Sequence, residues 1–303
     1  MGIRKLVNRV GVFMFFFCLL AGVSSAEEDG EKIVIAVSPC SDEVLSFKKF
    51  HPLVTYLQAE TGTEIKLVFP PDAAEFEAQI MNKDIDFVFQ DPNVYVKFAG
   101  LYDQKTLLRA LSLKGGIYQS GAIVARKDSN INTMKDLIGK SVMFGSKLSA
   151  SKWVVAKMLF EENGIDIDKD LSMYANGGCC EDILFNVFLK AFDAGVVCDH
   201  YLGEHAKKQR ELGVNAQDLH IIAITRWVPT RVFAARKDLD PALIAKFDRA
   251  LLKLNNSNPE HAKILYSAEV GGFQRTTDKH YDEMRELIGE KRSDRSAASV
   301  KGR

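Results

Sequence analysis

The first part of the chain alternates between short apolar runs and stretches in which apolar residues recur at helical spacing. Three runs rich in β-branched and aromatic residues have the pattern of buried strands: residues 33–37, 65–69 and 85–89. From Phe50 onward, apolar side chains repeat at i, i+3, i+4 and i+7, which predicts a helix with Pro52 in its first turn. Another helix is expected between the second and third strands. This βαβαβ order predicts a mostly parallel sheet flanked by helices.

A second series of the same kind follows two strand-like runs at residues 107–112 and 121–126. It contains a helix through residues 154–160 and a helix around Ile183 and Val187. Its expected strands are residues 141–144, 171–175 and 193–197. The chain then leaves this series along residues 219–225 and returns along residues 231–235.

These patterns predict an α/β protein of two lobes, each a mostly parallel sheet flanked by helices. Lobe 1 is expected to comprise residues 27–118 and 226–292, and lobe 2 residues 119–225. The two segments that cross between the lobes, near residues 119–122 and 225–230, form the predicted hinge. Because clefts between lobes are preferred ligand sites, the ligand is expected there. The small, polar residues 293–303 are expected to be disordered.

The N-terminus has the layout of a secretory signal peptide. Basic residues precede an apolar run at residues 10–23, and the small residues Ser24, Ser25 and Ala26 suit cleavage after Ala26. The apolar run is short for a membrane span, although retention as an uncleaved anchor is the alternative. The sequence therefore predicts residues 1–26 as a signal peptide and a periplasmic mature protein.

Charge and cysteine content narrow the class of protein further. The chain has 40 basic and 40 acidic residues, and removing the signal leaves 40 − 3 = 37 basic residues. This near balance argues against a nucleic acid or an anionic membrane as partner. The four cysteines that remain outside the signal are too few for a disulfide scaffold. No nucleophile, zinc-protease, Walker or dinucleotide motif is present, so we expect a protein that is not an enzyme and has no cofactor.

The stretch after the strand at residues 141–144 is a candidate anion site. Gly145 and Ser146 permit a turn, and Ser149 or Ser151 can cap the following helix. Such a turn directs free backbone N–H groups and the positive end of the helix outward. The alternative is an ordinary helix cap with no ligand.

Several segments resemble one family. Residues 91–95, 117–129 and 136–142 are similar to those of the periplasmic phosphate, phosphite and phosphonate-binding proteins of ABC transporters, which have the type II periplasmic binding protein fold. In that family a serine-rich loop at a helix N-terminus holds the oxyanion. The resemblance therefore implies ligand-binding roles for Ser149 and Ser151. Tyr95 and Tyr118 match positions where family members place aromatic rings against the ligand.

The chain departs from the family at residues 177–182. Where the family has a serine and a histidine that contact the oxyanion, this chain has Cys179 and Cys180, with Glu181 as the retained acidic residue. The family's acidic residue for a ligand amine falls near Asp199. These changes predict a ligand that is less charged, or larger and more apolar, than a simple phosphonate, with Tyr95 and Tyr118 supplying contact area.

The adjacent cysteines leave three alternatives open. They are free thiols, they form disulfides with Cys40 or Cys198, or they bind metal together with Cys198 and His200. The spacing common in zinc sites is absent, so no metal site is expected.

The resemblance implies a solute-binding protein that captures a small anion between its lobes and delivers it to the permease of an ABC importer. A first alternative is a periplasmic sensing module for a membrane receptor. A second is an enzyme similar to the thiamine pyrimidine synthases, against which the secretory signal argues. The protein is expected to be a monomer.

Overall fold

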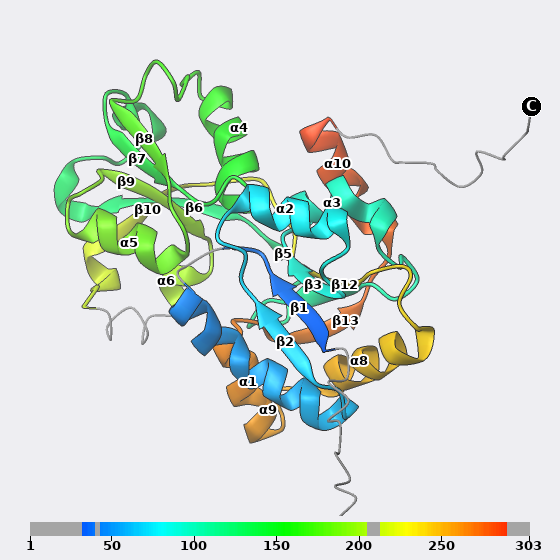
Figure 1. Ribbon diagram of the computed structural model, residues 1–303. Coiled ribbons are helices and arrows are strands. Elements are labelled where there is room, and N and C mark those ends of the chain that lie inside the picture. Colours follow the sequence, from blue (N-terminus) through cyan, green and yellow to red (C-terminus); the bar gives the residue numbers. More distant parts are fainter. Residues whose placement is uncertain (1–31, 40–42, 205–212, 290–303) are drawn as a thin grey trace, which may run out of the picture. The chain divides into compact units, whose positions relative to one another are not determined.

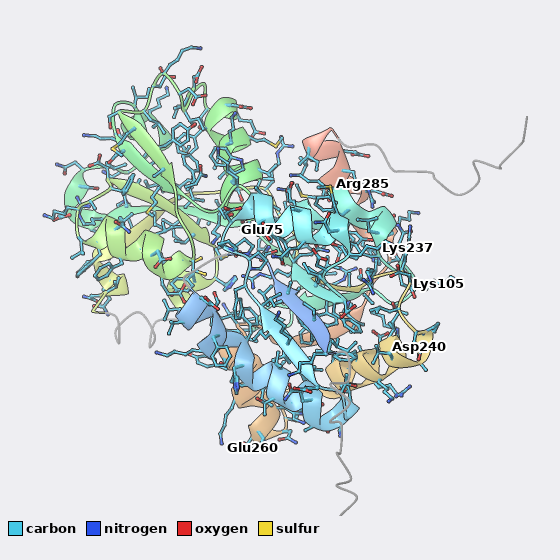
Figure 2. All side chains as sticks on the ribbon, in the orientation of Figure 1. Glu75, Lys105, Lys237, Asp240, Glu260 and Arg285 are labelled. Atoms are coloured by element: carbon cyan, nitrogen blue, oxygen red, sulfur yellow. The ribbon has the colours of Figure 1, made fainter. Side chains whose placement is uncertain are left out.

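The computed structural model describes residues 32–39, 43–204 and 213–289 (Figure 1). The predicted signal peptide, Cys40 and the predicted tail at residues 293–303 lie outside the described residues. Within those ranges, no helix combines the length and the apolar character that crossing a membrane requires. Charged side chains such as Lys105, Asp240 and Glu260 lie on the outer surface (Figure 2).

The first sheet has six strands in the order β13-β4-β12-β3-β1-β2. Their bounds are β1 Ile33–Val37, β2 Ile65–Val68, β3 Phe87–Gln90, β4 Leu108–Leu111, β12 Val232–Ala235 and β13 Gly272–Arg275. The pairs β1–β2 and β1–β3 are parallel, whereas β12 pairs antiparallel with both β3 and β4, and β13 pairs antiparallel with β4. The returning strand β12 therefore joins the two parts of this sheet.

Helices cover both faces of the first sheet, because successive strand residues point to opposite faces. Phe87 and Phe89 of β3 belong to one core and Val88 to the other. The first core is covered by α1 Glu43–Thr61, α8 Pro241–Lys253 and α9 Pro259–Ser267, which lie together in Figure 1. The second is covered by α2 Ala73–Asn82, α3 Pro92–Phe98 and α10 Asp282–Ile288.

The second sheet has five strands in the order β10-β6-β9-β7-β8. Their bounds are β6 Gly121–Arg126, β7 Ser141–Phe144, β8 Met173–Asn176, β9 Ala194–Cys198 and β10 Leu219–Ile224. The pairs β7–β8 and β7–β9 are parallel, and β6 pairs antiparallel with β9 and β10. The helices of this lobe are α4 Val155–Glu162, which follows a π-helical turn Ala150–Val154, α5 Cys180–Phe188 and α6 Tyr201–Glu204. Short 3-10 turns elsewhere are Ala99–Leu101, Lys127–Ser129, Met134–Leu137, Ala216–Asp218 and Asp278–Tyr281.

The two crossing segments pair with each other. Strand β5 Tyr118–Gln119 runs antiparallel to β11 Val228–Pro229. Beside this ribbon, the backbone N–H of Gly121 donates to the Thr225 hydroxyl at 2.7 Å. A side chain at Gly121 would collide with the backbone oxygen of Ser151, which would be 2.4 Å from its Cβ. The hinge motion assigned to these segments stays a prediction.

The predicted two-lobed α/β fold is confirmed, with one correction to the sheets. Both sheets are mixed rather than mostly parallel, because strands that return from the other lobe or from the C-terminal part of the chain add antiparallel pairs. Strands β3 and β8 begin two residues later than expected, since the buried Ile85 and Leu171 pack just before each strand.

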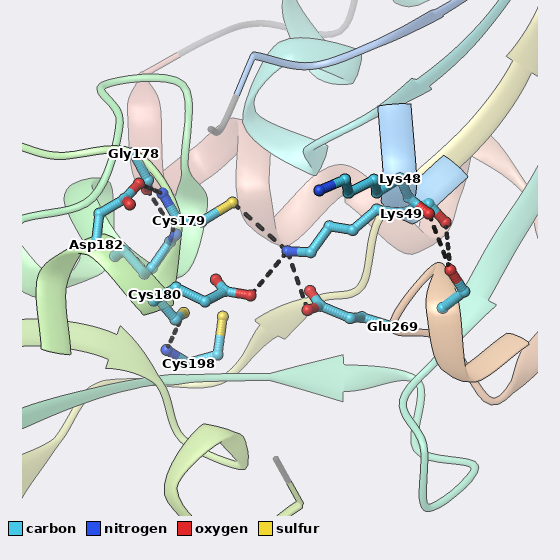
Figure 3. A network of polar contacts seen from close by, with 11 residues as sticks. Lys48, Lys49, Gly178, Cys179, Cys180, Asp182, Cys198 and Glu269 are labelled. Carbon is cyan, nitrogen blue, oxygen red and sulfur yellow. Dashed lines mark hydrogen bonds and ion pairs between the residues drawn. The ribbon is translucent and has the colours of Figure 1, made fainter. Parts of the chain in front are cut away.

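The position predicted for Pro52 is wrong, because this proline lies in the interior of α1. Proline has no N–H, so the backbone carbonyl four residues earlier, at Lys48, loses its helical hydrogen bond. The hydroxyl of Ser267 in α9 donates to the carbonyls of Lys48 and Lys49 at 3.3 and 3.0 Å (Figure 3). A hydrogen bond from Ser267, more than two hundred residues away in the sequence, thus replaces the helical hydrogen bond that Pro52 cannot make.

Candidate functional site

A cavity of about 50 Å³ is lined by residues of both lobes. By the measure in which one water occupies about 10–15 Å³, it has room for a few waters or one small ligand. Its lining comes from the end of β4, the start of β12, the segment after α9, the crossing strand β5, and the beginnings of α4, α5 and α6. The lining residues are Ala110, Leu111, Ser112, Gln119, Lys152, Cys179, Cys180, Glu181, Cys198, His200, Tyr201, Thr230, Arg231, Glu269 and Val270.

Lys152 reaches the cavity from the π-helical turn that precedes α4. Its side chain is only 6% exposed, and its Nζ donates to the backbone oxygen of Gly178 at 3.3 Å. The aliphatic part of the side chain passes over Gly145, where a Cβ would come within 2.5 Å of the Lys152 Cβ. Burial alone would lower the pKa of the ammonium group, but the neighbouring Cys180 and Cys198 raise it overall. Lys152 is therefore a buried cation.

Arg231 reaches the cavity from the residue before β12. Its guanidinium lies over the ring of Phe89, 5.5 Å from the ring centroid, and is partly buried. Within the part of the chain that the structure describes, no carboxylate lies at ion-pair distance from Arg231 or Lys152, although Asp91 attracts both cations from further away and Glu181 attracts Lys152. The two side chains place positive charge on opposite lobes of the same cavity.

The carboxylates of the cavity are paired with a third cation, Lys49 of α1. Its Nζ lies 3.2 Å from a carboxylate oxygen of Glu181 in α5 and 2.9 Å from one of Glu269 (Figure 3). The same Nζ lies 3.8 Å from Sγ of Cys179. Since Lys49 and Glu181 belong to different lobes, this cluster links the lobes. The single positive charge of Lys49 also offsets half of the negative charge that Glu181 and Glu269 bring to the cavity.

The three cysteines of the cavity differ in state. Cys179 is disulfide-bonded and precedes α5 as its cap, whereas Cys180 and Cys198 are free thiols. The partner of Cys179 lies outside the described residues, so the predicted alternative of a bond to Cys198 is wrong. The hydrogen bond from the Cys198 thiol lowers the pKa of Cys180 to about 6 despite burial, and Lys152 acts in the same direction. The backbone N–H of Cys198 also donates to Sγ of Cys180, at 3.2 Å.

The predicted serines lie beside the cavity and not among its lining residues. Ser149 caps the π-helical turn as expected, because its hydroxyl accepts from the backbone N–H of Lys152 at 3.2 Å. However, the first N–H of that turn, on Ala150, donates to a carboxylate oxygen of Asp91 at 2.8 Å. Asp91, which follows β3 in the other lobe, thus supplies the negative charge at this helix end. The assignment of ligand oxygens to Ser149 and Ser151 stays a prediction that this geometry does not favour.

We expect Asp91 to make the stability of the protein depend on pH. Burial raises the pKa of its carboxyl to about 6 from 3.8, against the hydrogen bonds from Asn93 and Ala150. Between about pH 4 and pH 6 the folded protein keeps a proton that the unfolded chain has lost, so the free energy of unfolding falls as pH rises. The full fall is about 3 kcal/mol, at about 1.4 kcal/mol for each pKa unit.

Urea unfolding of the wild type and of Asp91→Asn, measured across this pH range, tests the expectation. The amide retains an acceptor oxygen for both N–H groups but cannot ionise, so the variant lacks this component of the pH dependence. Parallel pH curves for the two proteins would refute it.

The predicted tyrosines do not reach this cavity. Tyr95 is fully buried in lobe 1, and its hydroxyl donates to Asp278 at 2.8 Å. Tyr118 is exposed and lies with Trp227 around a separate, open hollow. Asp199 is 3.3 Å from Nδ1 of His200 and lies beside the lining. Of the eight predicted ligand residues, the structure therefore brings Cys179, Cys180 and Glu181 together in the cavity.

Sequence reasoning missed the two cations of the site, and it named Cys198 and His200 only as a possible disulfide partner or as metal ligands. Lys152 directly follows a predicted site serine, and Arg231 begins a predicted strand, but a basic residue at either position is ordinarily solvated. Cys198 and His200 flank the predicted Asp199, and their position beside it was the sequence signal that this segment lines the cavity. Among the residues with described positions, no group of three or more His, Cys, Asp or Glu side chains is arranged to hold a metal ion.

Two lobes of mixed sheet joined by a paired crossing, with a ligand-sized cavity lined from both, define a solute-binding protein of the type II periplasmic class. The sequence matches the family described as "ABC transporter, phosphonate, periplasmic substrate-binding protein" over residues 35–281, more than half of the chain. The chain belongs to this family. Its members are binding components of transporters and not enzymes, as expected from the sequence.

The individual relatives described next share only 18–26% sequence identity with this chain. The phosphate-import protein PhnD of Mycolicibacterium smegmatis is 26% identical over 234 residues, which cover 74% of this chain and 72% of that protein. Among solved structures, the binding component of an ABC phosphonate transporter from Pseudomonas aeruginosa is 19% identical, with a TM-score of 0.74 over 85% of this chain and 86% of that chain. PhnD1 of Prochlorococcus marinus, in complex with methylphosphonate, is 18% identical, with a TM-score of 0.69 over 84% and 96%. At such identities the structural likeness shows the fold.

Proposed function

We propose that the protein is exported to the periplasm, captures a small anion in the cavity between its lobes and delivers it to an ABC importer. The observation that carries this proposal is the pair of cations, Lys152 and Arg231, on the wall of one cavity with no carboxylate in ion-pair contact among the described residues. A buried charge that lacks a counter-charge is costly. A bound anion offsets that cost and receives charge-assisted hydrogen bonds from both lobes.

The other charges of the cavity favour an anion of low charge. Glu181 and Glu269 share Lys49 as their ion-pair partner, which leaves one net negative charge in the cavity, and Glu181 also attracts the ammonium group of Lys152 from further away. Cys180, with its lowered pKa, shares the positive charge of Lys152 near neutral pH. Because part of the charge of Lys152 is thereby used, a monoanion matches the cavity better than a dianion does. A monoanion is also in line with the first of the two alternatives predicted from the sequence, a ligand that is less charged than a simple phosphonate.

The size of the cavity and the printed roles of the relatives indicate which ligands to try first. A cavity of about 50 Å³ suits a ligand of a few heavy atoms. The relatives are named for phosphate import, for phosphonate transport and for a complex with methylphosphonate. Methylphosphonate and inorganic phosphate are therefore the first probes.

Calorimetric titration of the mature chain with each anion tests the proposal. We expect saturable binding of one anion per chain, and a rise in unfolding free energy of about 2.7 kcal/mol at one hundred times Kd. Glycerol, which is of similar size and uncharged, is the control and should produce neither effect. Mass spectrometry of small molecules released on gentle unfolding extends the search to ligands outside this pair. Release of no anion, together with no response to any small oxyanion, would overturn the proposal.

A further inference from the structure

Two free thiols, Cys180 and Cys198, lie side by side on the wall of the cavity, and the proposed anion binding does not require their sulfur atoms as ligands. Cys180 is the first residue of α5 and Cys198 the last residue of β9, so backbone elements of one lobe position both sulfur atoms. The backbone N–H of Cys198 donates to Sγ of Cys180 at 3.2 Å, and the two labelled side chains lie beside each other (Figure 3). Both side chains line the cavity, which gives them a route for a small species.

We propose that Cys180 and Cys198 form a two-thiolate binding site for a soft metal cation, represented by Cu(I), with Lys152 as its counter-charge. This site goes beyond the anion-binding function, because it depends on sulfur atoms that an oxyanion does not require. Thiolates are the protein ligands that Cu(I) prefers. Cu(I) also accepts coordination by two thiolates alone, so two neighbouring cysteine side chains are a sufficient ligand set.

The charges of the complex balance within the cavity. Binding forms two sulfur–copper bonds, releases the thiol protons to solvent and transfers no electrons. One Cu(I) with two thiolates carries a net charge of −1, and the buried ammonium of Lys152 carries +1 beside both sulfur atoms. Among the residues the structure places, the Nζ of Lys152 donates only to the Gly178 carbonyl, so its ammonium group can also face the complex.

The ligand set also excludes the commoner alternatives. Structural zinc requires four ligands in a tetrahedron, and within the described ranges no group of three His, Cys, Asp or Glu side chains is arranged for a metal. Hard cations such as Mg²⁺ require oxygen ligands. The carboxylates that line the cavity, Glu181 and Glu269, are paired with Lys49.

The test begins with the purified mature chain, in which thiol counting after unfolding should find two free thiols. Titration with Cu(I) against a competing chelator under anaerobic conditions should then show one Cu(I) per chain and the ultraviolet thiolate-to-copper band. Cys180→Ser and Cys198→Ser should each lose both. X-ray absorption of the wild-type complex should show two sulfur neighbours, which tests the site even if a variant fails to fold.

The matched control is His200→Asn, which replaces another potential metal ligand on the cavity wall and should keep the bound Cu(I). Loss of Cu(I) in this variant would overturn the two-thiol assignment, as would a Cys180–Cys198 disulfide that persists in the exported protein. Calorimetry with methylphosphonate on the serine variants separates the two proposals. Serine variants that lose Cu(I) binding but still bind methylphosphonate would support the two-thiolate site. A wild-type protein that binds Cu(I) but no anion would refute the proposed anion binding and leave the copper site standing.

Discussion

Replacing Lys152 with methionine should weaken anion binding by roughly 10- to 150-fold. The methionine retains the apolar part of the side chain over Gly145 but removes the buried ammonium group. A hydrogen bond to a charged group contributes about 1.5–3 kcal/mol, and each 1.4 kcal/mol is tenfold in affinity. The affinity for whichever anion is identified, measured by calorimetry, gives the result directly. Arg231→Gln should cause a loss of similar size from the other lobe.

The control for Lys152→Met is the same substitution at Lys157, on the exposed side of α4. Lys157 is 3.9 Å from Glu161 and faces solvent, so its loss should leave the affinity unchanged. Tyr95→Phe is a second control, because the Tyr95 hydroxyl is engaged with Asp278 inside lobe 1. Equal losses at Lys152 and Lys157 would mean that the anion responds to net charge and not to the cavity.

Asp278→Ala should lower the free energy of unfolding by about 3–5 kcal/mol, the effect of leaving one charge of a buried pair without its partner. Asp278 forms an ion pair with Arg285 of α10, and both side chains are buried. Arg285 is labelled in Figure 2, where α10 lies beside α3. The Arg285 guanidinium would keep the Asp278 carbonyl and the more exposed Asp282 as its only described partners. The urea midpoint of unfolding measures the loss.

Two further variants show whether the loss comes from the unpaired charge. Asp282→Ala removes the partly exposed partner of Arg285 and should cost less than about 1 kcal/mol. Combining Asp278→Leu with Arg285→Met removes both charges, so most of the stability should return. A double variant as unstable as Asp278→Ala would indicate that packing, and not charge, dominates here.

The fold was largely predictable because its main signals are local. A run such as residues 33–37 is apolar and β-branched whatever surrounds it, and it forms β1. The errors arose where distant segments decide the structure. Pro52 is accepted within α1 because Ser267 supplies the missing hydrogen bond. The antiparallel character of the first sheet depends on β12, which enters between β3 and β4 from far along the chain.

The site was less predictable for the same reason. Its thiols stood out because Cys179 and Cys180 are unusual neighbours in a glycine-rich turn. Nothing in the sequence around Lys152 or Arg231 distinguishes them from exposed basic residues. They line one cavity only because the two lobes approach each other. The helix end near Ser149 had the expected form. The negative charge at this helix end comes from Asp91, which is 59 residues from Ala150, so no local sequence pattern could predict the contact.

The order of strands in the two sheets has a consequence for how the chain is made. Every strand of the second sheet lies between Gly121 and Ile224, so that sheet can complete its pairing from one continuous segment as the chain emerges into the compartment where it folds. The first sheet cannot, because β3 and β4 are neighbours only through β12. Until β12 has emerged, β3 has an open edge beside Phe87 and Phe89, and such edges favour aggregation. Lobe 1, whose first strands emerge before those of lobe 2, is therefore the lobe whose sheet is completed last.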